Sequence, residues 1–294
     1  MSQLLRLKMA KQKAEAFLKE EGITRLPVDP FAIAASRDII VEPKADTSDG
    51  VSGMLLRHGD SFGILYATHV QNEGFQRFSI AHELGHFILD GHVDHVLPKD
   101  GTHTSHAGFV SADPYELEAD HFAAGLLMPS GPFRRAIGRR DPGLAVIEAM
   151  AADCRTSLTA TAIRYAELCD DAVGVIISTG QRIDYCFLSE AMKSLPELSW
   201  LRKGTPVPKG TETARMNGNP DRIMEADRAA NEIDVMDWLG GKRSVLITEE
   251  VAGLGRYGKT LTVLSSCSIG HEDEIEPGDD EWEMIESWTP RFHR

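Results

Sequence analysis

One stretch of the sequence constrains both the fold and the chemistry of this chain. Over residues 76–89, apolar residues recur at the three- and four-residue spacing of an amphipathic helix. Within this stretch His82, Glu83 and His86 fit the pattern HExxH. Side chains four positions apart lie on the same face of a helix, so the two imidazoles can bind one metal ion. The stretch therefore predicts a helix that carries two ligands of a metal site.

Glu83 has a separate role in this pattern. Its side chain lies one step around the helix and can reach a water molecule on the metal, whose pKa zinc lowers to about 7. As general base, Glu83 would take a proton from that water, which then becomes a nucleophile at neutral pH. The alternative is a helix with two surface histidines, because HExxH also occurs by chance. A catalytic zinc needs a third protein ligand and an open position.

The first candidate for the third ligand lies in a second helical pattern, over residues 114–128. Glu116 and Asp120 share one face of this helix, so Glu116 could bind the metal while Asp120 accepts a hydrogen bond from a ligating imidazole. Glu118 lies about 200° around the helix from Glu116, so only one of the two can face the metal. We favour Glu116 and keep Glu118 as the alternative.

The second candidate is His92, which follows His82 by ten residues as in the longer motif HExxHxxGxxH. That motif has glycine where this chain has Leu89, and the glycine here is displaced to position 91. This difference weakens the alternative. We otherwise interpret His92 and the other histidines that follow it (His95, His103 and His106) as ordinary loop residues, with the alternative that one of them binds substrate or stabilises the oxyanion.

Several elements are predicted around these two helices. An amphipathic pattern predicts a helix over residues 3–21, a short helix follows near residues 30–36, and residues 39–41 fit a strand. Two apolar runs around residues 58–60 predict a β-hairpin over residues 51–66. The stretch from Gly91 to Pro114 has no periodicity and is expected to be a long loop.

The pattern changes in the second half of the chain. Further helices are predicted at residues 133–137, 144–153 and 157–168. Beyond about residue 170, β-type runs dominate, and one helix is expected around residues 225–239. The β-type runs cover residues 172–178, 182–189, 243–251 and 259–267. Residues 271–288 are dense in acids and are expected to form a solvated tail or a strand flanked by disordered charged residues.

Charge and composition exclude some classes of protein. Acidic residues outnumber basic ones by 45 to 31, a formal net charge of −14, which argues against a chain that mainly binds phosphate backbones. The helices at 144–152 and 157–168 have the length and turn of a helix-turn-helix. Acidic residues nearly balance their arginines, so we expect these helices to pack against the rest of the chain and consider direct nucleic-acid binding unlikely.

The compartment follows from two further features. No apolar run is long enough to span a membrane, and the N-terminal residues carry charges throughout, so we expect a cytoplasmic protein. The four cysteines (Cys154, Cys169, Cys186 and Cys267) form no CxxC pair, and we expect reduced thiols.

Two segments together, RFSIAHELGHFIL and ELEADHFAAGLLMP, closely resemble the ImmA/IrrE family of bacterial zinc metallopeptidases. The resemblance covers about residues 10–130. It implies a zincin-like domain in which His82 and His86 bind zinc, Glu83 is the catalytic base and a glutamate of the second helix is the third ligand. Many relatives have asparagine in place of Asp120. The family is known for cleaving helix-turn-helix repressors, which derepresses mobile elements or stress genes.

We therefore expect an α+β protein with a zincin-like metallopeptidase domain at residues 1–130, a helical segment at 131–170 and a C-terminal α/β domain, sensor-like in some relatives, at 171–294. The expected function is zinc-dependent hydrolysis of a peptide bond in a transcriptional repressor or antitoxin. One Zn²⁺ per chain is expected, although manganese or iron could also bind such ligands. An extended peptide could pair with a free edge of the hairpin. The alternative function is a non-catalytic metal-binding component of regulation or of a toxin-antitoxin pair.

Overall fold

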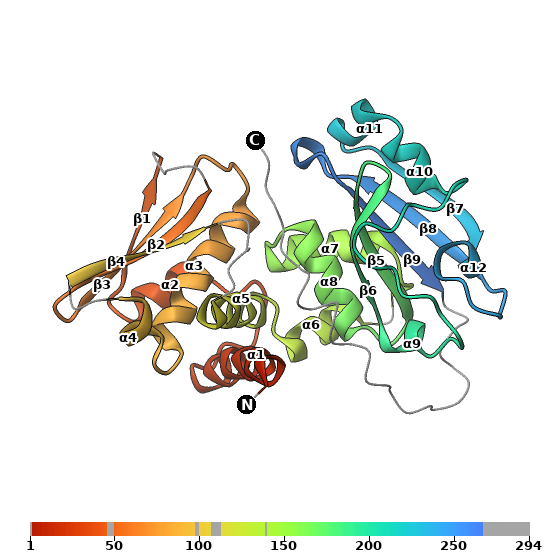
Figure 1. Cartoon of the computed structure of the whole chain (residues 1–294). Helices are drawn as coiled ribbons and strands as arrows, with labels where there is room; N and C mark the ends of the chain where they lie inside the picture. The colour runs from red at the N-terminus through yellow and green to blue at the C-terminus, as the bar shows by residue number, and fades with distance from the viewer. Residues whose placement is uncertain (1, 46–49, 98–99, 107–112, 139, 267–294) are drawn as a thin grey trace. The chain divides into compact units, whose positions relative to one another are not determined.

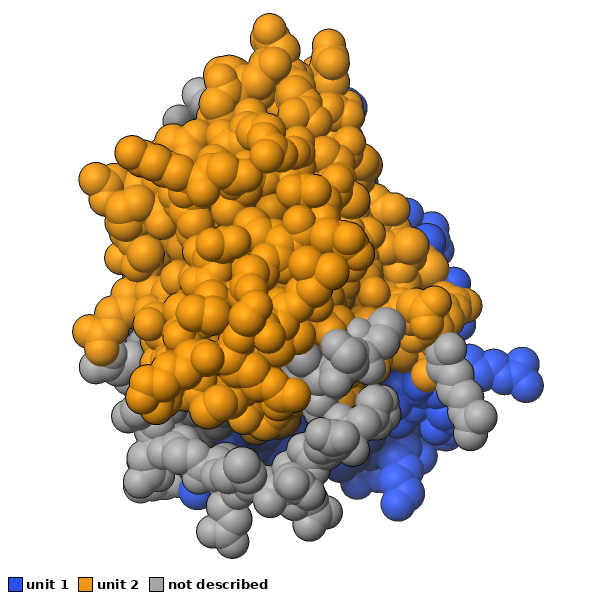
Figure 2. Space-filling model, turned by 90° about the vertical axis from the view of Figure 1, so that its right-hand side faces the viewer, with its two compact units in different colours: residues 1–136, 150–160, 289–292 blue, residues 137–149, 161–288, 293–294 orange. Residues whose placement is uncertain are grey.

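The computed structural model describes residues 2–45, 50–97, 100–106, 113–138 and 140–266 (Figure 1). The chain forms two compact units, shown in two colours in Figure 2. Unit 1 consists of the residues up to 136 and of residues 150–160, and unit 2 of residues 137–149 and the described residues from 161 onward. The three domains expected from the sequence stay a prediction.

Unit 1 contains a four-stranded sheet with the strand order β1-β3-β2-β4. Strand β1 pairs with β3 in parallel, whereas the other two pairings are antiparallel. The elements are α1 (Gln3–Glu20), α2 (Pro30–Ala35), β1 (Ile40–Lys44), β2 (Val51–His58), β3 (Ser61–Ala67), α3 (Glu73–Ile88), α4 (His92–Val96), β4 (Asp100–His106), α5 (Pro114–Leu127) and α6 (Ser130–Ile137). The first two predicted helices and the hairpin are confirmed.

Side-chain caps determine where the two site-bearing helices begin. The side chain of Asn72 accepts a hydrogen bond of 3.0 Å from the backbone N–H of Phe75, so α3 begins three residues before its apolar pattern does. Asp113 accepts one of 2.9 Å from Tyr115, and Pro114 takes the first position of α5, where no backbone donor is needed. Both helices therefore start at residues that favour a helix N-terminus.

Two glycines let α5 pack closely between α3 and α1. A β-carbon on Gly85 of α3 would lie 3.2 Å from Ala119 Cα of α5. A β-carbon on Gly125 of α5 would lie 2.9 Å from the carbonyl oxygen of Lys11 in α1. Phe122 and Leu126 of α5 are completely buried in this contact region. The close approach brings the first turn of α5 near the histidines of α3.

The start of α3 packs closely against a turn that follows it far along the chain. A β-carbon on Gly74 would lie 2.5 Å from the backbone nitrogen of Ser157 and 2.7 Å from the carbonyl carbon of Thr156. Arg155 in the same turn forms an ion pair with Glu73. This turn joins α7 (Leu144–Cys154) to α8 (Leu158–Leu168), the two helices with the length of a helix-turn-helix. The turn is thus covered by the helix that carries the HExxH residues.

The stretch from Gly91 to Pro114 is not a continuous loop, and that prediction was wrong. It contains α4 and β4, although residues 98–99 and 107–112 lie outside the described residues. Strand β4 is held by backbone pairing with β2, which needs no apolar alternation. The hairpin expected to offer a free edge lies inside the sheet, because β1 and β4 pair with its outer sides. Among the described strands, β4 is the edge beside the site.

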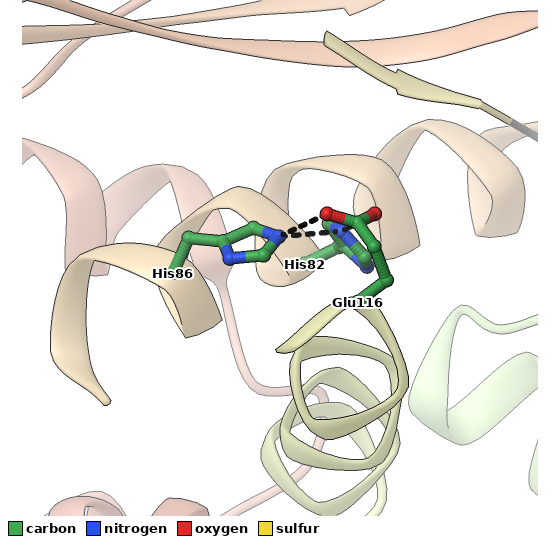
Figure 3. A group of neighbouring side chains, drawn as sticks. All are labelled: His82, His86 and Glu116. Atoms are coloured by element: carbon green, nitrogen blue, oxygen red, sulfur yellow. Dashed lines mark hydrogen bonds and ion pairs between the residues drawn. The ribbon is translucent and has the colours of Figure 1, made fainter. Parts of the chain in front are cut away.

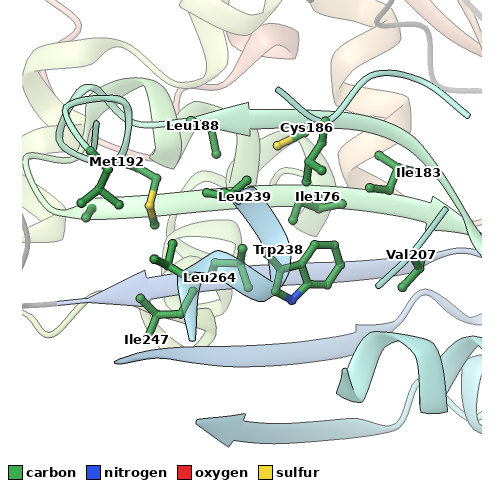
Figure 4. Packing of buried hydrophobic residues seen from close by; sticks show 14 residues of the cluster. Ile176, Ile183, Cys186, Leu188, Met192, Val207, Trp238, Leu239, Ile247 and Leu264 are labelled. Atoms are coloured by element: carbon green, nitrogen blue, oxygen red, sulfur yellow. The ribbon is translucent and has the colours of Figure 1, made fainter. Parts of the chain in front are cut away.

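Unit 2 contains a five-stranded, entirely antiparallel sheet with the order β6-β5-β9-β8-β7. Its further elements are β5 (Ala172–Thr179), β6 (Arg182–Leu188), α9 (Glu190–Lys193), α10 (Glu212–Asn217), α11 (Pro220–Met224), β7 (Arg228–Asp234), α12 (Val235–Leu239), β8 (Leu246–Gly253), a short 3-10 helix (Gly255–Tyr257) and β9 (Thr260–Ser266). Figure 4 shows part of the core, in which Trp238 and Leu239 of α12 pack with Ile176 and Leu264 of the sheet. The α+β class is confirmed.

The prediction of a helix around residues 225–239 was wrong for most of this range. Residues 228–234 form strand β7, which pairs with β8 so that Ala230 lies opposite Glu250. Only the last five residues are helical, and the side chain of Asp234 accepts a hydrogen bond from Met236 at the start of α12. Alanine and acidic residues favour a helix, but pairing with a distant strand outweighs that local preference.

The remaining predictions concern the C-terminal segment, the cysteines and membrane-spanning helices. The acidic segment at 271–288 and Cys267 lie outside the described residues. Cys154, Cys169 and Cys186 are free cysteines in the structure. Among the described residues, no helix combines the length and the apolar character that crossing a membrane would require.

Candidate metal centre

The structure brings His82 and His86 of α3 together with Glu116 from the first turn of α5 (Figure 3). One donor atom from each residue lies within 4.8 Å of the other two. The two Nε2 atoms are 3.1 Å apart, and the oxygens of Glu116 lie 3.4 Å from His82 Nε2 and 3.2 Å from His86 Nε2. Ligand atoms around tetrahedral zinc are about 3.3–3.6 Å apart, because each lies about 2.0–2.2 Å from the metal. These donors therefore fit one zinc ion.

Burial and charge determine which ligands carry protons. His86 is completely buried, and burial lowers its pKa to about 3, so its ring is neutral. Burial would raise the pKa of Glu116, but hydrogen bonding to His103, His82 and His86 outweighs it and lowers that pKa. Glu116 is thus a carboxylate at neutral pH. A neutral imidazole and an ionised carboxylate are the forms that bind a metal.

His82 differs from His86 because its second ring nitrogen faces an acid. His82 Nδ1 lies 2.8 Å from Asp120 Oδ1, and both side chains are buried. Burial alone lowers the pKa of His82, but the carboxylates of Asp120 and Glu116 outweigh it and hold that pKa well above its usual value. Asp120 thereby orients the ring so that Nε2 points at His86 and Glu116, as outer carboxylates do in metal sites.

Glu83 is completely buried beside these residues, and neither of its carboxylate oxygens has a hydrogen-bond partner among the residues that the structure describes. Burial raises its pKa, while the nearby His82, Ser105 and His103 act in the opposite direction. A β-carbon on Gly53 of β2 would lie 2.6 Å from Glu83 Oε1, so the absence of a side chain at position 53 makes room for the carboxylate. A buried acceptor without a partner is costly unless a water or ligand satisfies it.

Sequence reasoning missed His103, which the structure adds to this site. His103 lies on β4, and its Nε2 is 2.9 Å from Glu116 Oε1. His103 and Ser105 are two positions apart and therefore share one face of the strand. That alternation was the available signal, but it was hidden because residues 91–114 were interpreted as a loop. The side chain of His106 lies outside the described residues.

The two alternative ligands, Glu118 and His92, lie outside the group of three. His92 contacts the far ring nitrogen of His86, with 3.2 Å between the two Nδ1 atoms. Glu118 lies 3.4 Å from His92 and pairs with Arg6 of α1. Neither reaches the space between the two Nε2 atoms and Glu116. The assignment of ligands itself stays a proposal.

Residues 42–165 match the model of a peptidase family whose description is "IrrE N-terminal-like domain". This segment includes the elements from β2 to α7, whereas α1 and α2 precede it. The resemblance to the ImmA/IrrE family is confirmed over these residues.

A solved structure titled "Mycobacterium tuberculosis transcriptional regulator" is similar to this one, with a TM-score of 0.53. The two share 14% sequence identity, and the match covers 87% of this chain and 76% of the other. At that identity the likeness concerns the fold alone. No curated protein matches the sequence.

Proposed function

Because residues 42–165 match the IrrE N-terminal-like domain of a peptidase family, we propose that this protein is a zinc-dependent regulatory endopeptidase. Its substrate would be a protein that controls transcription, such as a helix-turn-helix repressor or an antitoxin. One observation carries the proposal above all. Within the described part of the chain, the buried carboxylate of Glu83 has no hydrogen-bond partner, and it lies beside three converging metal donors. A structural metal site would not need such a group.

The residues around the proposed metal divide the work of peptide hydrolysis. His82, His86 and Glu116 would hold a zinc ion, which supplies Lewis acidity toward a peptide carbonyl and toward water. Glu83 takes the proton of the attacking water as the water oxygen bonds to the carbonyl carbon. It then delivers that proton to the amide nitrogen as the carbon–nitrogen bond breaks, so that a carboxylic acid and an amine are released.

The edge strand β4 supports a peptide as the substrate. Its pairing with β2 leaves its other side without a partner among the described strands. An extended peptide can add to such an edge through backbone hydrogen bonds. His103 and Ser105 of β4 lie at the site itself, next to Glu116 and Glu83 respectively. A peptide on this strand would therefore pass the proposed zinc and the catalytic base.

The test compares the zinc-loaded wild type with Glu83→Gln in a proteome extracted from a host cell. New protein N-termini are labelled and identified by mass spectrometry, and the zinc content of both proteins is measured in parallel. We expect equal zinc in both and new termini with the wild type only. Identical termini with both proteins, despite bound zinc, would support the non-catalytic alternative. A wild type that binds no zinc would remove the chemistry altogether.

A further inference from the structure

A second line of polar side chains lies behind His86, on the ring nitrogen that does not face His82 and Glu116. His86 Nδ1 is 3.2 Å from His92 Nδ1, and His92 Nε2 is 3.4 Å from Glu118 Oε2. Glu118 Oε1 is in turn 2.5 Å from the guanidinium of Arg6. His86 and His92 are both buried, whereas Arg6 at the outer end is partly exposed.

The proton positions along this line follow from the metal site. If His86 Nε2 binds a metal, its ring proton must be on Nδ1. Among the described residues, that N–H faces His92 Nδ1, which can accept it only when that nitrogen carries no proton. The proton of His92 is then on Nε2, where it faces the carboxylate of Glu118. Every donor meets an acceptor in this arrangement, whereas the other tautomer of His92 would place two N–H groups against each other.

We propose that His92 and Glu118, the latter held by an ion pair with Arg6, form a directed hydrogen-bond chain that orients His86 for the metal. His92 and Glu118 are thus positioning residues and not metal ligands. This positioning role rests on the proposed function and its metal site. It explains how the second histidine ligand, His86, is held in place. Asp120 contacts His82 directly, whereas Glu118 is linked to His86 through the imidazole of His92. Both ligands thereby have a carboxylate behind them, the arrangement that fixes ring orientation and raises ligand basicity.

The chain of contacts ends outside the segment that matches the peptidase family. Arg6 belongs to α1, whose residues 3–20 precede the matched residues 42–165. The guanidinium of Arg6 also lies over the ring of Tyr115, 5.3 Å from its centroid, and that ring contacts His92 edge-on. Helix α1 thus contributes a charge that holds Glu118 in place. This gives α1 a role at the metal site besides its packing against α5.

The first test measures the zinc dissociation constant of metal-free protein by competition with a chromophoric chelator. His92→Phe keeps a ring but removes the acceptor, and we expect zinc affinity to fall about 10- to 100-fold. His92→Asn keeps an acceptor near the Nδ1 position and should recover part of the loss. Glu118→Gln should show a smaller loss than His92→Phe. The melting temperature of each metal-free variant is measured alongside.

His95→Phe is the matched control, because His95 lies on the same helix α4 and stacks on Tyr115, 3.8 Å between ring centroids, without contacting His86. We expect its zinc affinity to equal that of the wild type. Wild-type affinity in His92→Phe would overturn the chain. If the wild type binds zinc and the His92 and Glu118 variants bind it with the same affinity, this inference is wrong. The proposed function would still stand.

The second test needs no variant and applies even if His92→Phe does not fold. Nitrogen-15 correlation spectra of the zinc-loaded wild type report which ring nitrogens carry protons or metal. We expect His86 to have a proton on Nδ1 and metal on Nε2, and His92 to have its proton on Nε2 alone. A proton on His92 Nδ1, or zinc bound to either nitrogen of His92, would overturn the proposal.

Discussion

Gly53 of β2 lies directly against Glu83 of α3, and a β-carbon at position 53 would stand only 2.6 Å from Glu83 Oε1. The contact joins the central strands of the sheet to the proposed catalytic base. Because Glu83 is completely buried, its carboxylate has little room to move aside. The sheet therefore determines where the base sits, independently of the three metal donors.

Gly53→Ala should separate catalysis from metal binding. The added methyl group would displace the Glu83 carboxylate, and a displacement on the order of 1 Å costs about 100-fold in rate. Zinc affinity should not change, because the three atoms nearest to the added β-carbon all belong to Glu83 and none to a metal donor. Hydrolysis of an identified substrate and zinc binding are measured on the same preparation. Gly63→Ala is the control, since its β-carbon would meet the nearest atom at an ordinary 3.6 Å and should retain activity.

Substitutions on the two helices should discriminate between the candidate ligands. Glu116→Ala and His86→Ala should each lose the bound zinc, because each removes one of three converging donors. Glu118→Ala and His92→Ala should retain one equivalent when zinc is in excess, since they support His86 from behind. Elemental analysis of the purified proteins measures the difference. Loss of zinc in Glu118→Ala with retention in Glu116→Ala would reverse the assignment.

Zinc binding should release about one proton at neutral pH. The pKa of His82 in the metal-free protein lies well above its usual value, so Nε2 is protonated at pH 7 and must lose its proton to the metal. His86, with a pKa of about 3, and the ionised Glu116 contribute none. Affinity should therefore rise with pH, by about tenfold per unit, until the pH passes the pKa of His82.

Calorimetry in buffers with different ionisation enthalpies counts the protons released. Asp120→Asn is an informative companion, because it keeps an oxygen near His82 Nδ1 but removes the charge that helps to hold the extra proton. Proton release at pH 7 should be smaller in this variant. A wild type that releases no proton would contradict the protonated state of His82.

Glu249 should be a main determinant of stability in unit 2. This buried residue of β8 accepts hydrogen bonds from the backbone N–H groups of Glu212 and Thr213, and from the Thr213 hydroxyl at 2.6 Å. Glu249→Ala would leave the two backbone N–H groups without this acceptor, and we expect a loss on the order of 3 kcal/mol in the free energy of unfolding. Urea denaturation measures it. Glu232→Ala, at an exposed position of β7, should change stability by less than about 0.5 kcal/mol.

Local patterns were enough to predict which residues of the two helices come together in the candidate site. Helical periodicity and the four-residue spacing placed His82 and His86 on one face of α3, because an α-helix has the same geometry wherever it occurs. The same reasoning placed Glu116 and Asp120 on one face of α5 and separated Glu118 from them. The hairpin was predictable for a similar reason, since its turn and both its strands are contiguous in the sequence.

The tertiary structure decided what depends on segments far apart in the chain. The packing of α5 against α3 through Gly85 determined that Glu116 faces both Nε2 atoms, while Glu118 lies behind His86 with His92. Pairing of β4 with β2 brought His103 and Ser105 to the site from a stretch without apolar periodicity.

The same distinction explains the one wrongly predicted helix of unit 2. Residues 228–234 favour a helix locally but form a strand because β8 offers backbone partners. The sequence by itself thus determined the two site-bearing helices and the face on which each potential ligand lies, because these follow from the repeat of a single helix. Only the tertiary structure decided which faces meet, because helix packing and strand pairing depend on contacts that no local pattern contains.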